Sequence, residues 1–331
     1  MYVAEVSANH QGSLERAKLI VEAAAAAGAT AVKFQTYTAD TMTLDIPQFS
    51  ISSDHALWGG KNLYDLYKMA HTPWEWHEEL FNLARELRMI PFSSPFDQSA
   101  VDFLESINTP MYKIASMETG DHALIRAAAA TGKPIIISTG ATEWEEIQQL
   151  VQVVHSTGNE ELTLLLCTSS YPSNPKESNL NRIMTLKNEF GCDVGLSDHT
   201  LGIGVSVAAI ALGATVIEKH LTLKRSDGGA DGAFSMEPQE FAELVVQGNM
   251  ASESLGTSQW EIQKSEKESR RLRRSLYVVQ DVQAGDLVTT ENVRAIRPGG
   301  GAPPMQLDTL LGMRFIDDFP RGFPMSLEIV N

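Results

Sequence analysis

The sequence has 331 residues, of which 21% are charged and 43% are hydrophobic, and its formal net charge is −16. This length predicts one large domain with a smaller one beside it. The negative charge argues against nucleic acid or an anionic membrane surface as a partner. Two cysteines, the lack of a signal-peptide pattern and the lack of a long apolar span predict a protein of the reducing cytoplasm, without membrane insertion.

Eight short apolar segments alternate with helical patterns from residue 2 to about residue 256. The predicted strands are VAEVS at Val3, AVKFQ at Ala31, IPFSS at Ile90, MYKIA at Met111, PIIIS at Pro134, LTLLLC at Leu162, DVGLS at Asp193 and TVIEKH at Thr215. Helices are predicted after them, for example over 13–27, 203–212 and 238–253. Eight βα units in about 250 residues indicate an α/β fold, a (β/α)8 TIM barrel over residues 1–256. A doubly wound open sheet is the alternative, because the order of strands in a sheet cannot be read from sequence.

The connections add further expectations about the architecture. The segment 36–71 is too long for an ordinary βα loop and contains an apparent helix at LYDLYKMA, so it is predicted to overhang the barrel mouth. Capping boxes predict helix starts at Thr72-Pro73-Trp74-Glu75 and at Thr142-Glu143-Trp144-Glu145. Residues 257–274 are predicted to be a charged linker, and residues 275–331 a small β-rich domain with strand-like pieces SLYVVQ, LVTT and RAIRP.

Polar residues mark one side of the predicted strand ends. Side chains two residues apart on a strand point the same way, and the C-terminal strand ends line the active site of a TIM barrel. Alternate positions such as Val32, Phe34 and Leu196 are apolar. The positions with inward parity are Glu5, Ser7, Lys33, Gln35, Ser94, Ser138, Cys167, Ser169, Tyr171, Ser197, His199, Glu218 and His220. The same parity turns Lys219 away from the mouth, which predicts a structural role for it.

His199 and His220 fall at equivalent heights on the seventh and eighth predicted strands. Two imidazoles at a barrel mouth suggest a divalent metal with open water positions. Manganese (Mn²⁺) is the first expectation, with Mg²⁺ and Co²⁺ as alternatives. A pair of hydrogen-bonded core histidines explains the spacing equally well.

A second group of residues is cationic and hydroxylic. Lys33 and Lys113 end the second and fourth strands, and hydroxyls come from Ser94, Ser116, Ser138 and Ser197. Each serine alone is more simply a strand-end or cap hydroxyl. On a chain of net charge −16, the joint set is better explained by an anionic ligand such as a phosphate. SDGGAD and PGGGAP lack the context of a dinucleotide site, and no GxxxxGK[ST] occurs, so nucleotide binding is not predicted.

The chain resembles the sialic acid synthase family in AEVSANHQGS, AVKFQTYT, SSPFD, YKIAS, GKPIIISTG, CTSSYP, GLSDHT, IEKH and IRPG. The resemblance implies a transferase that condenses phosphoenolpyruvate with an N-acetylated amino-sugar aldehyde, and an antifreeze-protein-like (SAF) domain after the barrel. DTMTLD, LWGGKNLYDLY and TPWEWHEELF are most similar to the pseudaminate branch, whose acceptor is a 2,4-diacetamido-2,4,6-trideoxy-altrose. N-Acetylneuraminate and legionaminate synthases, which use a manno-configured sugar, are the alternative.

Carried over motif by motif, the resemblance implies a role for each strand-end residue. His199 and His220 would bind the metal. The phosphoenolpyruvate would be held by Lys33, Ser94, Lys113, Ser116, Ser138 and Ser197. The sugar would be contacted by Glu5, Gln35, Glu118, Tyr171 and Asp231, of which Glu5 and Tyr171 would also serve catalysis. Arg297 would reach an N-acetyl group in the partner's barrel of a domain-swapped homodimer. Ser169 departs from the asparagine usual in neuraminate synthases, and its shorter side chain suits the pseudaminate branch.

Two other classes of protein compete with a synthase. A metal-dependent hydrolase barrel also uses strand-end histidines, but such sites usually need more of them, and an HxH pattern on the first strand is missing. A catalytically silent sugar-binding barrel would keep the scaffold, yet it would not require the histidine pair together with the lysines and serines.

Overall fold

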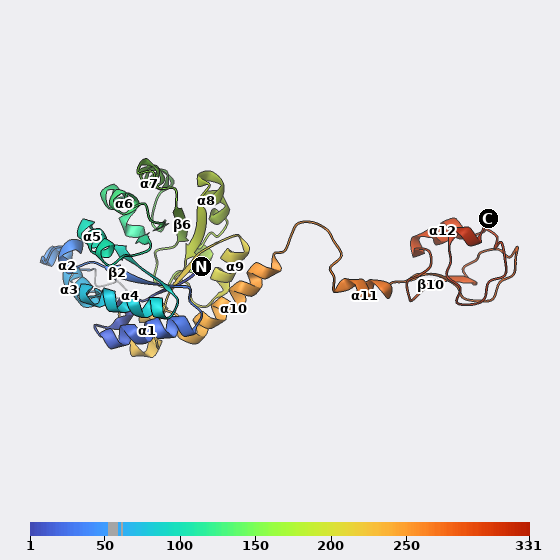
Figure 1. Ribbon diagram of the computed structural model, residues 1–331, viewed down its shortest axis with the longest axis horizontal. Coiled ribbons are helices and arrows are strands. Elements are labelled where there is room, and N and C mark those ends of the chain that lie inside the picture. Colours follow the sequence, from blue (N-terminus) through green and yellow to red (C-terminus); the bar gives the residue numbers. More distant parts are fainter. Residues whose placement is uncertain (52–58, 61) are drawn as a thin grey trace. The chain divides into compact units, whose positions relative to one another are not determined.

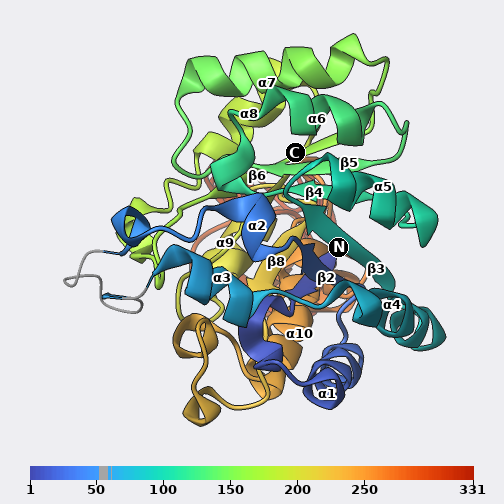
Figure 2. The same cartoon turned by 90° about the vertical axis from the view of Figure 1, so that its left-hand side faces the viewer.

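The computed structural model describes residues 1–51, 59–60 and 62–331. Two compact units divide the chain, Met1–Gly256 and Thr257–Asn331 (Figure 1). In the first unit eight strands close into a parallel barrel in chain order, with β1 beside β8. Figure 2 shows the helices arranged around these strands. The closed barrel confirms the predicted TIM fold and excludes the open sheet.

The elements of the first unit follow the predicted alternation of strand and helix. The strands are β1 (Tyr2–Glu5), β2 (Ala31–Thr36), β3 (Ile90–Pro95), β4 (Tyr112–Ile114), β5 (Ile135–Ser138), β6 (Leu162–Cys167), β7 (Asp193–Ser197) and β8 (Ile217–His220). The helices are α1 (Leu14–Ala26), α2 (Ala39–Met42), α3 (Leu63–Ala70), α4 (His77–Glu86), α5 (Gln98–Ser106), α6 (His122–Ala129), α7 (Trp144–Ser156), α8 (Arg182–Phe190), α9 (Gly204–Ala211) and α10 (Pro238–Ser254). The helix expected at LYDLYKMA is α3, whereas residues 57, 58 and 61 of the LWGGKNLYDLY motif lie outside the described residues.

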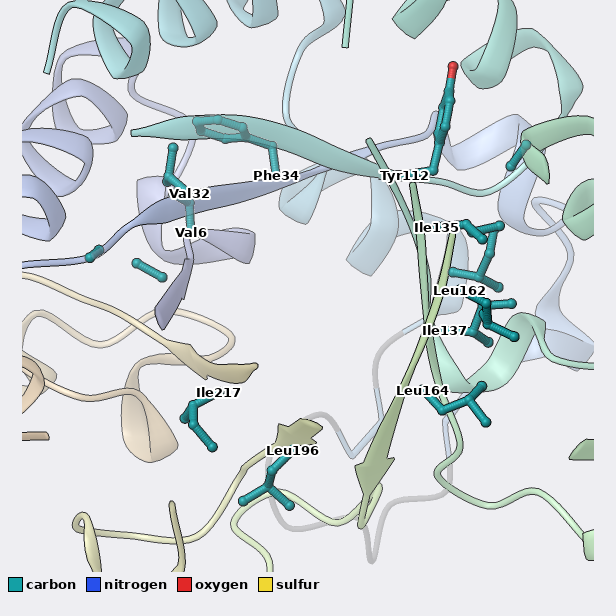
Figure 3. Packing of buried hydrophobic residues seen from close by; sticks show 14 of the residues in the cluster. Val6, Val32, Phe34, Tyr112, Ile135, Ile137, Leu162, Leu164, Leu196 and Ile217 are labelled. Atoms are coloured by element: carbon teal, nitrogen blue, oxygen red, sulfur yellow. The ribbon is translucent and has the colours of Figure 1, made fainter. Parts of the chain in front are cut away.

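Alternate side chains of the strands pack outward against the helices. Val32, Phe34 and Ile137 are fully buried in one cluster that includes helix residues (Figure 3). The ring of Phe34 stacks on Phe81 of α4, with centroids 5.7 Å apart. This layer is the main core of the first unit.

The inward side chains change from apolar to polar along each strand. A separate buried cluster inside the barrel comprises Val3, Ala31, Phe92, Ile136, Leu165 and Val216, with Met1 and Met111 packed against it. We call this cluster the apolar floor. Two residues further along the same strands stand Glu5, Lys33, Ser94, Ser138, Cys167 and Glu218. Because side chains repeat every two residues along a strand, a polar layer lies directly on the apolar floor.

Helical structure begins next to both starts predicted from capping boxes, but neither predicted threonine is the N-cap residue. Helix α7 begins after Glu143, which forms its capping box with Glu146, while the Thr142 hydroxyl donates to the carbonyl oxygen of Gly140. After Thr72 the chain forms a short 3-10 turn over Trp74–Trp76 before α4 begins. Threonine side chains bond to several kinds of backbone and side-chain groups. Here the Thr142 hydroxyl also contacts that of Thr119 at 3.0 Å, and the Thr72 hydroxyl contacts His10 Nε2 at 3.4 Å.

The second unit is built around a small antiparallel sheet. Its elements are α11 (Glu266–Arg271), β9 (Ser275–Val278), β10 (Val293–Ile296) and α12 (Leu307–Leu310), and β9 pairs with β10. It has its own core, which includes Leu276, Val278, Val293, Leu310 and Phe315. The prediction of a small β-rich domain after the barrel is confirmed. In the described part of the chain, no helix has both the length and the apolar character needed to cross a membrane.

Candidate active site

Four charged side chains meet above the apolar floor. Lys33 Nζ lies 2.5 Å from Glu5 Oε2 and 3.8 Å from Glu218 Oε1. Lys113 Nζ lies 3.1 Å from the same Glu218 oxygen, which also accepts from the Ser197 hydroxyl at 3.0 Å. None of the four charged side chains is more than 5% exposed. We call Glu5, Lys33, Lys113 and Glu218 the charge layer, in which two cations balance two carboxylates.

The two carboxyl groups of the charge layer differ in their proton affinity. Burial raises the pKa of Glu5, and Lys33 offsets only part of that rise. Burial would also raise the pKa of Glu218, but Lys113 and Lys33 together hold it well below its ordinary value. Glu218 is therefore the permanent counter-ion of the lysines, whereas Glu5 takes up a proton more readily. Neighbouring carboxyls with separated pKa values are typical of acid–base sites.

A cavity of about 360 Å³ opens above the charge layer. The predicted site residues that line it are Gln35, Ser116, Glu118, Tyr171, His220 and Asp231. Gln35 links the cavity to the charge layer, because its Nε2 donates to Glu5 Oε1 at 3.2 Å. Beside these polar residues the lining has an apolar part, which we call the apolar end. The apolar end consists of Tyr37, Met42, Leu63, Leu66, Tyr67 and Phe96.

The other predicted residues of the barrel are buried around the same space. They are Glu5, Lys33, Ser94, Lys113, Ser138, Ser197 and His199. The Ser138 hydroxyl has no hydrogen-bond partner among the described residues. Gly140 donates its N–H to Ser116 Oγ at 3.0 Å, and a Cβ at this glycine would lie 2.2 Å from Ser169 Oγ. Arg297 is exposed in the second unit and is not among these residues.

His199 and His220 lie side by side, with ring centroids 5.4 Å apart. His199 Nδ1 is 3.1 Å from the carbonyl oxygen of Thr168, so this nitrogen carries the hydrogen and Nε2 is left for another partner. His220 Nδ1 is buried and has no hydrogen-bond partner among the described residues. Burial lowers the pKa of His220 well below its ordinary value, so its ring is neutral. This geometry is not the hydrogen-bonded core pair of the alternative interpretation.

The two imidazoles fit a metal that takes few ligands from the protein. In the described ranges, no group of three or more histidine, cysteine, aspartate or glutamate side chains is arranged to hold a metal ion. A divalent ion would therefore have His199 and His220 as ligands and would keep its other positions for water or substrate. The observation that supports this fit is the buried Nδ1 of His220, which has no hydrogen-bond partner in the described part of the chain.

An ion pair behind the histidines fixes their backbones relative to each other. Lys219 Nζ lies 3.0 Å from Asp198 Oδ2, and it donates to the carbonyl oxygens of Thr200 and Gly202. Both charged side chains are 1% exposed. Lys219 precedes His220, and Asp198 precedes His199, so one buried pair joins the two histidine-bearing segments. These contacts agree with the structural role predicted for Lys219.

Some residues of the site were not identified as functional from the sequence. The Ser7 hydroxyl donates to Asp231 Oδ2 at 2.6 Å and orients that carboxylate in the cavity wall. The ring of Phe234 packs against His220 with centroids 5.0 Å apart. The inward parity marked Ser7 and Glu218 as polar but gave no partner for either. No sequence pattern indicated Phe234, whose position depends on the long connection between β8 and α10.

Glu118 is expected to make the stability of the protein depend on pH. Its Oε2 is buried without a hydrogen-bond partner in the described structure, and burial raises the pKa of Glu118 to about 7. Because this value exceeds the ordinary 4.5, folding favours the protonated form, and stability falls as pH rises from 4.5 through about 7. Glu118→Gln should therefore match the wild type at pH 5 and exceed its free energy of unfolding at pH 8 by about 1–3 kcal/mol.

Urea denaturation at the two pH values measures this difference. The pH profile of the activity provides a second readout, because a titration near pH 7 in the wild type should be absent in Glu118→Gln. Identical unfolding free energies of wild type and variant at pH 8 would show that Glu118 titrates normally.

The barrel, the buried lysines and the paired histidines, followed by a small β domain, define a TIM-barrel enzyme with an accessory domain. The NeuB family model matches residues 20–260, and the SAF domain model matches residues 273–326. The chain belongs to the NeuB family, which confirms the resemblance seen in its motifs.

Several relatives are similar to this protein over almost the whole chain. The pseudaminic acid synthase of Helicobacter pylori is 42% identical over 330 residues, which cover 99% of this chain and 97% of the relative. The Campylobacter jejuni pseudaminic acid synthase is 39% identical, covering 97% and 93%. The N,N'-diacetyllegionaminic acid synthase of Legionella pneumophila is 35% identical, covering 99% and 94%.

A solved structure of N-acetylneuraminic acid synthetase from Leptospira borgpetersenii, in complex with citrate, shares the fold. It matches with a TM-score of 0.73 and 32% identity, covering 81% of this chain and 89% of that chain.

Proposed function

We propose that the protein is a pseudaminic acid synthase. It condenses phosphoenolpyruvate with 2,4-diacetamido-2,4,6-trideoxy-L-altrose and water, and it releases pseudaminic acid and phosphate. The observation that carries this proposal is the 42% identity to the H. pylori pseudaminic acid synthase over nearly the full length of both chains. The legionaminate alternative has less support, because the L. pneumophila synthase is 35% identical over the same span.

In this proposal the charge layer receives phosphoenolpyruvate. Lys33 and Lys113 bind its phosphate and carboxylate, assisted by the hydroxyls of Ser94, Ser116, Ser138 and Ser197. Ser138 is 2% exposed and its hydroxyl has no partner among the described residues, which supports this role, since a buried polar group without a partner is costly and a ligand oxygen would satisfy it. The acceptor sugar occupies the cavity above, where Gln35, Glu118 and Asp231 offer polar contacts.

The proposed reaction forms a carbon–carbon bond and cleaves a carbon–oxygen bond. C3 of phosphoenolpyruvate attacks the C1 aldehyde of the open-chain sugar, water adds at C2, and the tetrahedral product loses phosphate. Glu5, whose pKa is raised by burial, exchanges a proton with the water or a sugar hydroxyl, and the lysines stabilise the leaving phosphate. Tyr171, whose ring centroid lies 4.4 Å from that of His199, positions the sugar. His199 and His220 would hold a divalent metal, with manganese as the proposed ion, and the metal would supply Lewis-acid polarisation of the aldehyde.

Phosphate release in the presence of three acceptors tests this function. We expect release only with a sugar and a divalent metal, with the diacetamido altrose preferred over its diacetamido manno analogue and over N-acetylmannosamine. With ¹⁸O in the bridging position of phosphoenolpyruvate, the label should appear in phosphate. A preference for N-acetylmannosamine would overturn the choice of acceptor, no release with any sugar would favour a silent binding barrel, and label in the ketone would exclude C–O cleavage.

We further propose a domain-swapped homodimer in the cytoplasm, in which Arg297 reaches the acceptor in the partner's barrel. Both cysteines are free thiols, which fits a reducing compartment. Mixing inactive Arg297→Ala and His220→Ala proteins tests the swap, because a hybrid dimer would contain one site with both residues intact. Activity should return on mixing and subunit exchange, and its absence in a proven hybrid would contradict the swap.

A further inference from the structure

The apolar end of the cavity is a built wall that the proposed chemistry does not use. It comprises Tyr37, Met42, Leu63, Leu66, Tyr67 and Phe96. These residues come from the segments after β2 and β3 and from helices α2 and α3. None of the six carries a charge, whereas the same lining also includes the ionisable side chains of Glu118, Asp231 and His220. The cavity therefore offers two different chemical environments to one ligand.

The aromatic part of the wall is held in place by ring packing. Tyr37 is 3% exposed and makes edge contacts with Tyr67 and Phe96, at centroid distances of 5.7 and 5.1 Å. The carbonyl oxygen of Tyr37 accepts from Trp74 Nε1 at 3.2 Å. A preorganised apolar surface binds apolar groups without the cost of ordering side chains first.

The position of the reaction in the cavity decides which part of a sugar meets this wall. The reacting C1 is placed near His220 of β8 and the charge layer, because phosphoenolpyruvate is proposed to bind there. The apolar end is built on the segments that follow β2 and β3, and the carbon chain carries C4 to C6 toward it. Leu63, Leu66 and Phe96 carry no hydrogen-bonding group, so a hydroxyl placed against them would lose water without a replacement.

We propose that the apolar end binds the C6 methyl group of the acceptor together with the methyl of its C4 acetamido group, and so selects 6-deoxy sugars over 6-hydroxy sugars. This inference rests on the proposed function, since it names the part of that site that recognises the distal half of the substrate. Burying a methyl group on the wall is favourable, whereas a hydroxyl at the same place must be desolvated.

Two polar substitutions of similar size test the subsite. Met42→Gln and Leu63→Asn replace half-buried wall residues and introduce amides without reducing the number of side-chain heavy atoms. Met69→Gln is the matched control, because Met69 lies on α3 with Leu63 but is 53% exposed and does not line the cavity. The measured quantity is the ratio of kcat/KM for two acceptors of identical configuration that differ only by a hydroxyl at C6.

We expect the wild type to prefer the 6-deoxy acceptor by at least about 10-fold, and each wall variant to lower this ratio about 5-fold, mainly through KM for the sugar. The KM for phosphoenolpyruvate and the ratio in Met69→Gln should stay unchanged. A ratio that is the same in wild type and both wall variants would overturn the proposal, as would equal losses with both acceptors. If the wild type uses only manno-configured sugars, the proposed function fails, and the ratio for N-acetylmannosamine and its 6-deoxy form still decides the role of the wall.

Discussion

Replacing Lys113 with methionine is expected to lower kcat/KM for phosphoenolpyruvate by about 10²- to 10³-fold and the free energy of unfolding by about 3 kcal/mol. The activity falls because a cation proposed to bind the substrate is lost. The stability falls because Glu218, 5% exposed, keeps only Lys33 at 3.8 Å as a salt-bridge partner. A buried carboxylate with too little compensation is more costly than a missing pair. Phosphate-release kinetics and urea denaturation measure the two effects separately.

Two controls separate the roles of Lys113. In Lys113→Met/Glu218→Gln both charges are absent, so we expect most of the stability to return while the activity stays low. Lys133→Met makes the same substitution in a surface pair with Glu105, whose side chains are 28% and 40% exposed, and should cost less than about 1 kcal/mol. Full activity of Lys113→Met would contradict the anion-binding role. A stability loss that persists in the double variant would contradict the counter-ion role of Glu218.

His199→Ala and His220→Ala are each expected to lower kcat by about 10³-fold, equivalent to about 4 kcal/mol of transition-state stabilisation. Each variant removes one of the two imidazoles proposed to bind a divalent ion. Wild-type activity should be lost after treatment with a chelator and restored by Mn²⁺. Electron paramagnetic resonance of added Mn²⁺ should show bound ion in the wild type and free ion in both variants.

His155→Ala is the control for this experiment, because His155 is exposed in the last turn of α7 and far in sequence from the candidate ligands. It should keep wild-type activity and Mn²⁺ binding. Wild-type activity that survives thorough chelation would refute the metal proposal, even if the histidine variants were inactive for another reason.

The fold could be predicted because its signals are local. Each strand carries a period of two, each helix a period near 3.6, and their alternation defines the barrel. The strand period of two residues also distinguished Lys33 and His220, whose side chains face the interior, from Phe34, whose side chain packs outward. The capping residues could not be predicted, because a threonine such as Thr142 can cap a helix or bond elsewhere, and Thr142 bonds to Gly140.

The partners within the site could not be predicted, because they depend on closure of the barrel. Lys113 and Glu218 are 105 residues apart, and no local pattern shows that β4 and β8 direct them at one point. The apolar end could not be predicted for the same reason, since Tyr37, Tyr67 and Phe96 meet only after α3 folds over the barrel mouth. Arg297 lies in a separate compact unit, and its proposed role stays a prediction.

The charge layer also bears on how such a barrel can be divided. Strands β1, β2 and β4 contribute Glu5, Lys33 and Lys113, two cations and one carboxylate, and the balancing Glu218 arrives on the final strand. A half-barrel of the first four strands would enclose an unmatched cation, so the two halves cannot be independent folding modules with neutral interiors. A circular permutation that keeps β1 beside β8 preserves the balance, whereas deletion of β8 opens the hydrogen-bonded ring and leaves its interior positively charged.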